Sequence, residues 1–228
     1  MSLSFDPHNP FPLIDLEAVS YREQQAHSAL VDDWLGLRTA EIEEQLVDMF
    51  DPVAAKEKDE RHWIGLPVQS LLTPYTEIRF LLSKLPVHHA HVVDLGAGYG
   101  RMGFVIARHF PATSFLGIEV VGERVREGAS ALARVVTTPT PSLRLIQADL
   151  AAADFALPHA EIYFIYDFGS LSAIEKTLSE LARISREKSI IVVGRGGATR
   201  NSIDKKHAWL SQVRPPEHFR HFSVYRSS

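Results

Sequence analysis

A short apolar strand that runs into a glycine-rich turn constrains this chain more than any other stretch. Val92-Val93-Asp94-Leu95 has the length and the β-branched residues of a buried strand. Glycines follow at positions 96, 98 and 100, and the apolar residues beyond position 101 suit a helix packed on a sheet. Glycine allows positive φ and close approach of a ligand, and a helix N-terminus offers free N–H groups. The stretch therefore predicts a strand, a turn and a helix that together bind a nucleotide-like ligand.

Two kinds of site use such a turn. Residues 98–103 fit G-x-G-x-x-G, the dinucleotide pattern, which is a weak signal on its own. The wider run, Asp94 followed by Gly96, Gly98 and Gly100, resembles motif I of the class I S-adenosylmethionine (SAM) dependent methyltransferases, an acidic residue followed by G-x-G-x-G. Asp94 favours the second pattern, since the ammonium group of SAM needs an acceptor and a dinucleotide fold runs apolar residues up to its first glycine. A glycine turn without a ligand is the third alternative.

Beyond the turn, strands and helices alternate. Apolar runs predict strands over residues 114–119, 143–149, 162–167 and 189–194, with helices over 122–134 and from about 170 to 185. This alternation predicts a doubly wound, mostly parallel α/β sheet. Segments 209–213 and 219–225, separated by two prolines, predict an antiparallel hairpin like the one that closes the Rossmann-like sheets of class I methyltransferases. Residues 203–210 fit a short helix equally well.

Acidic residues close three consecutive strands: Asp94, Glu119 and Asp149. Glu119 lies about twenty residues beyond the glycines, where an acid can accept the hydroxyls of a ribose. The resemblance implies that Glu119 binds the ribose of SAM, that Asp149 binds the adenine amino group, and that Val120 and Leu150 enclose the adenine ring. Asp149 could instead cap a turn. The resemblance also implies that SAM is the cofactor and S-adenosylhomocysteine (SAH) the product. The cofactor-binding residues that it implies are Thr73, Tyr75, Asp94, Gly96, Ala97, Gly98, Tyr99, Gly100, Glu119, Val120, Asp149, Leu150, Asp167 and Phe168.

Tyr166-Asp167-Phe168-Gly169 follows the fourth strand, in the place of motif IV, where methyl group and acceptor meet. Methyl transfer from a sulfonium requires an aligned nucleophile and a route for its proton. Asp167, with Tyr166 beside it, is the candidate catalytic residue, and capping of the following turn is an equally good explanation of Asp167. The resemblance implies a methyltransferase acting on an unidentified N or O acceptor, a protein side chain or a small molecule.

An acidic helical extension, residues 1–69, precedes the predicted SAM-binding domain, residues 70–228. Residues 1–60 carry four Lys and Arg against fourteen Asp and Glu, and the rest of the chain is basic. We expect one helix from Asp15 to about Leu30, a second from Asp32 or Asp33 to near Phe50, and a third that Thr73 caps and Pro74 begins. The first two should pack over or beside the acceptor opening, or cross to a second subunit of a homodimer.

The composition further limits the kinds of site and partner that the chain can have. The chain has no cysteine, which excludes disulfides and thiolate metal sites and fits a cytoplasmic protein. His88, His89 and His91 precede the first strand, at the end opposite to ligand sites in open α/β sheets, so we expect no metal. We also expect no membrane segment. Residues 1–60 are too acidic to be a nucleic-acid arm, which disfavours a nucleic-acid partner without excluding one. The rival functions are an NAD(P)-dependent Rossmann oxidoreductase and a non-catalytic SAM-binding module.

Overall fold

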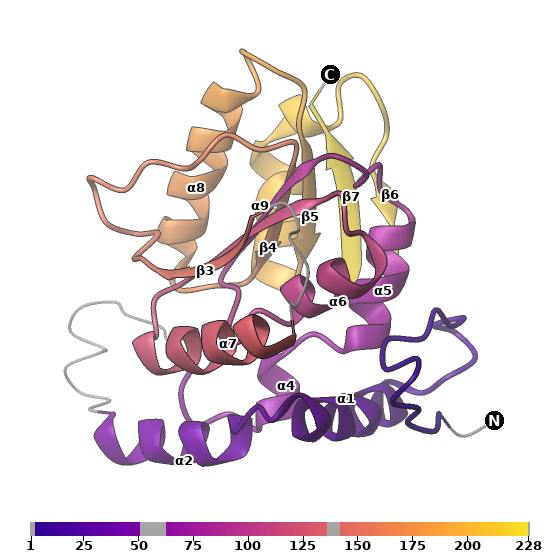
Figure 1. The fold of residues 1–228 in the computed structure, drawn as a ribbon. Helices are drawn as coiled ribbons and strands as arrows, with labels where there is room; N and C mark the ends of the chain where they lie inside the picture. The colour runs from indigo at the N-terminus through magenta and orange to yellow at the C-terminus, as the bar shows by residue number, and fades with distance from the viewer. Residues whose placement is uncertain (1–2, 51–62, 136–141, 228) are drawn as a thin grey trace.

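The computed structural model describes residues 3–50, 63–135 and 142–227. Residues 51–62, part of the predicted N-terminal extension, lie outside the described residues. The described strands form one seven-stranded sheet in the order β3-β2-β1-β4-β5-β7-β6, in which β7 runs antiparallel to β5 and β6 (Figure 1). Their bounds are β1 His91–Leu95, β2 Ser114–Glu119, β3 Leu143–Gln147, β4 Ile162–Tyr166, β5 Ile191–Arg195, β6 Glu217–His218 and β7 Phe222–Arg226.

Helices cover both faces of this sheet (Figure 1). Alternate residues of β1 show the two layers, because Val92 belongs to the core beneath α5, α6 and α7, whereas Val93 belongs to the core beneath α8 and α9. The predicted doubly wound sheet is confirmed. The helices are α1 Tyr21–Leu35, α2 Thr39–Met49, α4 Val68–Leu71, α5 Tyr75–Ser83, α6 Arg101–His109, α7 Gly122–Val135, α8 Leu171–Ile184, α9 Gly197–Lys206 and the 3₁₀ turn η1 Ala208–Leu210.

The predicted bounds of the first helix and the predicted start of the second are wrong, whereas the second helix ends at Met49, next to the predicted Phe50. Ser20, not Asp15, caps α1, through a capping box with Glu23. The helix then continues past Leu30 until Gly36, whose φ of 68° ends it in the left-handed conformation. Trp34 therefore lies on α1 rather than on the next helix, and its side chain is 44% exposed.

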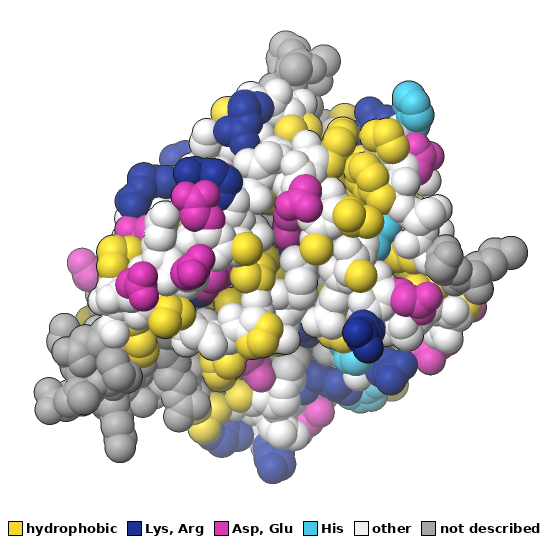
Figure 2. Space-filling model, turned by 90° about the horizontal axis from the view of Figure 1, so that it is seen from below, with side chains coloured by type: hydrophobic (Ala, Val, Ile, Leu, Met, Phe, Trp, Pro, Cys, Tyr) yellow, Lys and Arg dark blue, Asp and Glu magenta, His cyan; other side chains and the backbone are white. Residues whose placement is uncertain are grey.

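The two N-terminal helices pack against α4, α5 and α7, beneath the sheet in the view of Figure 1. Figure 2 shows this underside, where hydrophobic and acidic side chains are interspersed. Met49 at the end of α2 is 65% exposed, whereas Ile42 and Leu46 of the same helix are buried. Both described helices of the extension are thus packed on the α/β core and have a mixed outer surface.

Two further bounds differ from the prediction. The antiparallel C-terminal hairpin is confirmed, but its first strand is β6 rather than residues 209–213. The alternative of a helix over residues 203–210 is met in part, because the end of α9 buries Ile203 and η1 buries Leu210. Thr73 is not an N-cap: α5 begins after Pro74, and no side chain caps it. No helix among the described residues has the length and apolar character to cross a membrane.

Candidate functional site

The glycine turn joins β1 to α6 at the carboxyl edge of the parallel strands. Gly96, Gly98 and Gly100 have φ of 84°, 55° and 73°, a region that side chains disfavour. Space also excludes a side chain at Gly96, since a Cβ there would lie 2.8 Å from the Cβ of Phe168. Phe168, in the segment after β4, thus packs against the glycine turn at the position where Gly96 has no side chain.

Two adjoining hollows open beside this turn. The first, which we call the Asp94 hollow, encloses ≈ 610 Å³, part of it open to solvent, and its polar lining residues are Thr73, Glu77, Asp94, Arg101, Tyr166 and Arg195. The second, the Trp63 hollow, encloses ≈ 690 Å³ and is lined by Trp63, Leu66, Gly98, Arg124 and Asp167 among others. Leu71, Leu72, Gly96 and Tyr166 line both. The predicted site residues that the structure brings together here are Thr73, Asp94, Gly96, Ala97, Gly98, Tyr166 and Asp167.

Asp94 is the carboxylate at the floor of the first hollow. Among the residues that the structure describes, none donates a hydrogen bond to it or forms an ion pair with it. Burial and the negative charge of Glu119 raise the pKa of Asp94 to about 7. An unpaired carboxylate in such a hollow is suited to bind a cationic group.

Glu119 is buried at the end of β2. Its carboxylate accepts the backbone N–H of Gly98 at 2.9 Å and that of Val121 at 3.0 Å, and one of its oxygens lies 3.9 Å from Nη1 of Arg124. A carboxylate can accept about four hydrogen bonds, so Glu119 keeps acceptor capacity for a ligand hydroxyl.

The predicted adenine residues lie outside both hollows. Asp149 is exposed and accepts the backbone N–H of Ala151 at 2.8 Å, which makes it the cap of a turn in this structure. Val120 is half-buried and Leu150 buried. Their assignment to the adenine stays a prediction.

Asp167 reaches from the end of β4 to the first turn of α9. Its carboxylate accepts the backbone N–H groups of Ala198 at 3.1 Å and Thr199 at 2.8 Å, and a Cβ at Gly196 would lie 2.2 Å from it. The Asp167 carbonyl accepts the indole N–H of Trp63 at 2.7 Å. The predicted capping role is therefore present, although the capped helix is α9 and not the next one in the chain.

Tyr166 is half-buried at the boundary of the two hollows. The guanidinium of Arg195 lies 4.2 Å from the centre of its ring. Glu77 holds Arg195 with a 2.8 Å contact to Nε, and Tyr21 accepts a hydrogen bond from its Nη2 at 2.8 Å. Arg195 of β5 thus packs on the ring of Tyr166, and Glu77 of α5 and Tyr21 of α1 hold Arg195 in that position.

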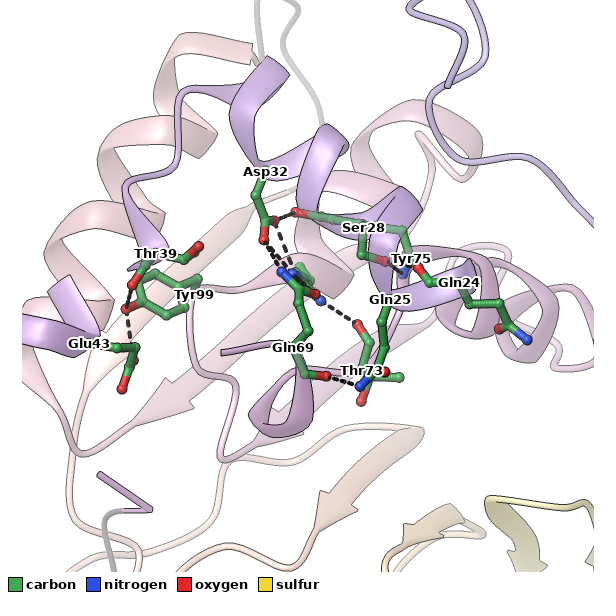
Figure 3. Close-up of polar contacts among 11 residues, drawn as sticks. Gln24, Gln25, Ser28, Asp32, Thr39, Glu43, Gln69, Thr73, Tyr75 and Tyr99 are labelled. Atoms are coloured by element: carbon green, nitrogen blue, oxygen red, sulfur yellow. Dashed lines mark hydrogen bonds and ion pairs between the residues drawn. The ribbon is translucent and has the colours of Figure 1, made fainter. Parts of the chain in front are cut away.

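Tyr75 lies away from the hollows that we expected it to line. Its side chain is fully buried, its hydroxyl donates to Asp32 at 2.8 Å, and its ring packs on the guanidinium of Arg101 at 4.8 Å (Figure 3). The reason is that α1 covers the start of α5. Tyr99 is likewise buried, with its hydroxyl 2.8 Å from Glu43 of α2, and neither Tyr99 nor Gly100 lines the two hollows.

Sequence reasoning missed four charged residues of this region. Asp32 of α1 pairs with Arg101, and Glu43 of α2 pairs with Arg124. All four side chains are at most 7% exposed. The helical spacing of Asp32 with Val31 and Leu35, and of Glu43 with Ile42 and Leu46, was the available signal for acids on a buried face. In the described ranges no group of three His, Asp or Glu side chains is arranged to hold a metal.

The strand order, with a reversed β7 inserted between β5 and β6, decides between the nucleotide-binding folds. A dinucleotide-binding sheet has the parallel order 3-2-1-4-5-6, whereas this chain ends in an antiparallel hairpin. The fold is that of a class I methyltransferase. The pyocyanin biosynthetic protein PhzM superposes on the chain with a TM-score of 0.50 at 13% identity, over 70% of this chain and 58% of that one.

Other solved structures of the class I methyltransferase fold are similar to smaller degrees. An RNA methyltransferase from Salinibacter ruber in complex with SAH gives a TM-score of 0.46 at 20% identity, over 68% of this chain and 91% of that one. A SAM-dependent methyltransferase from Aquifex aeolicus gives 0.45 at 14% identity, over 78% and 98%. The sequence matches no protein-family model and no curated protein.

Proposed function

We propose that this chain is a SAM-dependent methyltransferase that transfers a methyl group to an N or O acceptor. The observation that carries the proposal is Asp94: a carboxylate without a partner among the described residues, in a hollow beside the glycine turn. Asp94 is half-buried, and a partly desolvated carboxylate is costly unless a cation binds it. The ammonium group of SAM is such a cation.

The residues present fit this cofactor. Asp94 would hold the ammonium group, the side-chain-free backbone of Gly96 and Gly98 would adjoin the ligand, and Glu119 has acceptor capacity for the ribose. When bound, SAM supplies an electrophilic methyl group with a neutral thioether as leaving group. Val120, Asp149 and Leu150 remain our proposal for the adenine.

The chain's own contribution to transfer would come from the residues at the end of β4. Tyr166, fixed by Arg195, would orient the acceptor across the boundary of the hollows. The cap bonds hold the Asp167 carboxylate in one orientation, and its remaining lone pairs can accept an N–H or O–H of the acceptor. Protein side chains, small molecules and nucleic acids are all acceptors to test.

Binding separates the cofactor alternatives. We expect SAH to raise the melting temperature of the wild-type protein, NAD to leave it unchanged, and Asp94→Asn to lose most of the SAH effect. Asp154→Asn, a change outside both hollows, is the matched control. A shift by NAD without a shift by SAH would contradict the proposal.

The rival that an observation favours is a SAM-binding module without turnover. Because Asp167 already serves as a cap, the described site has no acid whose only use is catalysis. Incubation with labelled SAM and pooled proteins, small molecules and RNA distinguishes the two, since only an enzyme transfers label.

A further inference from the structure

Two arginines flank the glycine turn, one in the hollow that Asp94 lines and one beside Glu119, the two carboxylates that the proposed function assigns to the cofactor. Arg101, the first residue of α6, lines the same hollow as Asp94. Arg124 of α7 lies 3.9 Å from Glu119. An arginine that paired fully with either carboxylate would take the place of the ligand's ammonium or hydroxyl groups.

Asp32 of α1 holds the first arginine. Its carboxylate accepts Nε of Arg101 at 3.2 Å and pairs with Nη2 as well. Gln69 accepts a further bond from Nη2 at 3.0 Å, and the Thr73 carbonyl accepts one from Nη1 at 3.1 Å. Because the Arg101 side chain is 4% exposed, water can replace few of these hydrogen bonds, and the orientation of the guanidinium depends on the protein acceptors.

Glu43 of α2 holds the second arginine. Its two carboxylate oxygens accept Nε of Arg124 at 2.8 Å and Nη2 at 2.9 Å, a bidentate pair. The hydroxyl of Tyr99 donates to the same carboxylate at 2.8 Å. Glu43 thereby draws Arg124 toward the N-terminal helix, while its contact with Glu119 stays at 3.9 Å.

The two pairs repeat one arrangement. In each, an acid from an N-terminal helix binds an arginine that shares its surroundings with a cofactor carboxylate. We propose that α1 and α2 keep Asp94 and Glu119 available for the cofactor by holding Arg101 and Arg124, so that Asp32 and Glu43 are positioning residues of the cofactor site. This inference rests on the proposed function.

Variants at the first pair test it. Without the charge of Asp32, Arg101 is expected to turn to Asp94, the carboxylate left unpaired in its hollow. Asp32→Asn should therefore weaken SAH binding about tenfold, the factor for one lost charge-assisted hydrogen bond. Asp32→Asn combined with Arg101→Gln should bind SAH within about twofold of wild type, and Arg101→Gln alone should do the same. Arg38→Gln, which breaks the 2.8 Å pair with Glu127 between α2 and α7, is the control and should bind as wild type.

Removing one partner of a buried ion pair can unfold a protein, so a second variant, Glu43→Gln, is needed. In this variant Arg124 still has Glu119 as a partner, which limits the loss of stability. Glu43→Gln should weaken SAH binding, and adding Arg124→Gln should restore it. Failure of the arginine substitutions to restore binding, or loss of binding by Arg101→Gln alone, would overturn the proposal and mark the pairs as structural only.

A second readout needs no cofactor. In the wild-type protein the pKa of Asp94 is about 7, and in Asp32→Asn a turned Arg101 should lower it well below that value, as followed by NMR of the labelled carboxyl. An unchanged pKa would overturn the inference even if SAH binds. If the wild-type protein binds no SAH but the pKa falls as expected, the proposed function fails while the movement of Arg101 stands.

Discussion

The Asp167 carboxylate accepts the backbone N–H of Thr199 at 2.8 Å, which ties the end of β4 to the start of α9. The two residues are thirty-two apart in the chain, and Ala198 donates to the second oxygen at 3.1 Å. A candidate catalytic acid is therefore also the cap of a ten-residue helix, and its two roles predict different responses to mutation.

Asp167→Ala should lower the free energy of unfolding by about 1 kcal/mol, the usual cost of losing an N-terminal cap. Asp167→Asn keeps a cap acceptor and should cost less. If Asp167 also orients or deprotonates the acceptor, the Asn variant should bind SAH normally and transfer methyl about a hundredfold more slowly. Urea unfolding measures the first effect, and kinetics with an identified acceptor the second. Equal losses of SAH affinity and rate would leave only the capping role.

Glu119→Ala should weaken SAH binding by about ten- to a hundredfold, since each lost hydrogen bond to a charged acceptor costs about 1.5–3 kcal/mol. Titration calorimetry gives the dissociation constant. Glu123→Ala is the control, because Glu123 lies on the surface of α7 and its ion pair in the described part of the chain is with Arg126. An unchanged constant for Glu119→Ala would refute the ribose assignment.

The pKa of Asp94 predicts opposite effects of pH on stability and on binding. The folded protein holds the proton up to about pH 7, whereas an unfolded aspartate, with a pKa of 3.8, releases it earlier. The contribution of Asp94 to stability is thus fully present below pH 4 and is lost as pH rises toward 7. Asp94→Asn should raise the free energy of unfolding at pH 8 by about 1–3 kcal/mol, with no gain at pH 3.5.

For the wild type, SAH binding should weaken as pH falls below about 7, because an ammonium group favours the ionised Asp94. Chemical unfolding and calorimetry across pH 5–8 check both trends. An SAH affinity that does not change with pH would refute the contact between Asp94 and the ammonium group of the ligand.

Gly128 of α7 supports the glycine turn from below. A Cβ there would lie 2.3 Å from the carbonyl oxygen of Tyr99. Gly128→Ala should therefore destabilise the protein, although alanine favours a helix by about 1 kcal/mol over glycine. Gly197→Ala, with no atom within 4 Å of the added Cβ, is the matched control. Thermal unfolding of the two variants compares them, and equal melting temperatures would contradict this packing.

The α/β core was predictable because its signals are local. The run Val92–Leu95 with its glycines, and the alternation that follows, need no distant partner to be recognised. The role of Tyr75 was not predictable in this way, because its hydroxyl binds Asp32, forty-three residues earlier. The end of α1 differs for another reason: Asp32 and Asp33 predict a helix start, whereas Gly36, in the left-handed conformation, ends α1 after them.

In the candidate site, too, the residues with local sequence signals were predictable and those that depend on distant partners were not. Strand ends placed Asp94 and Glu119 correctly at the carboxyl edge, since parallel strands fix that edge. The arginines beside them are held by acids from α1 and α2, and a pairing over sixty-nine or eighty-one residues leaves no pattern in the chain. The same holds for Asp167, whose cap partner is set by how α9 folds back on the sheet.

Calorimetric titration of SAH at pH 8 into the wild-type protein and into Asp94→Asn is the decisive test of whether Asp94 binds the ammonium group of SAM. We predict saturable binding by the wild type and at least about tenfold weaker binding by Asp94→Asn, because the ammonium loses its charged acceptor. Absence of binding by the wild type, or equal binding by the two proteins, would contradict the assignment of this hollow to SAM.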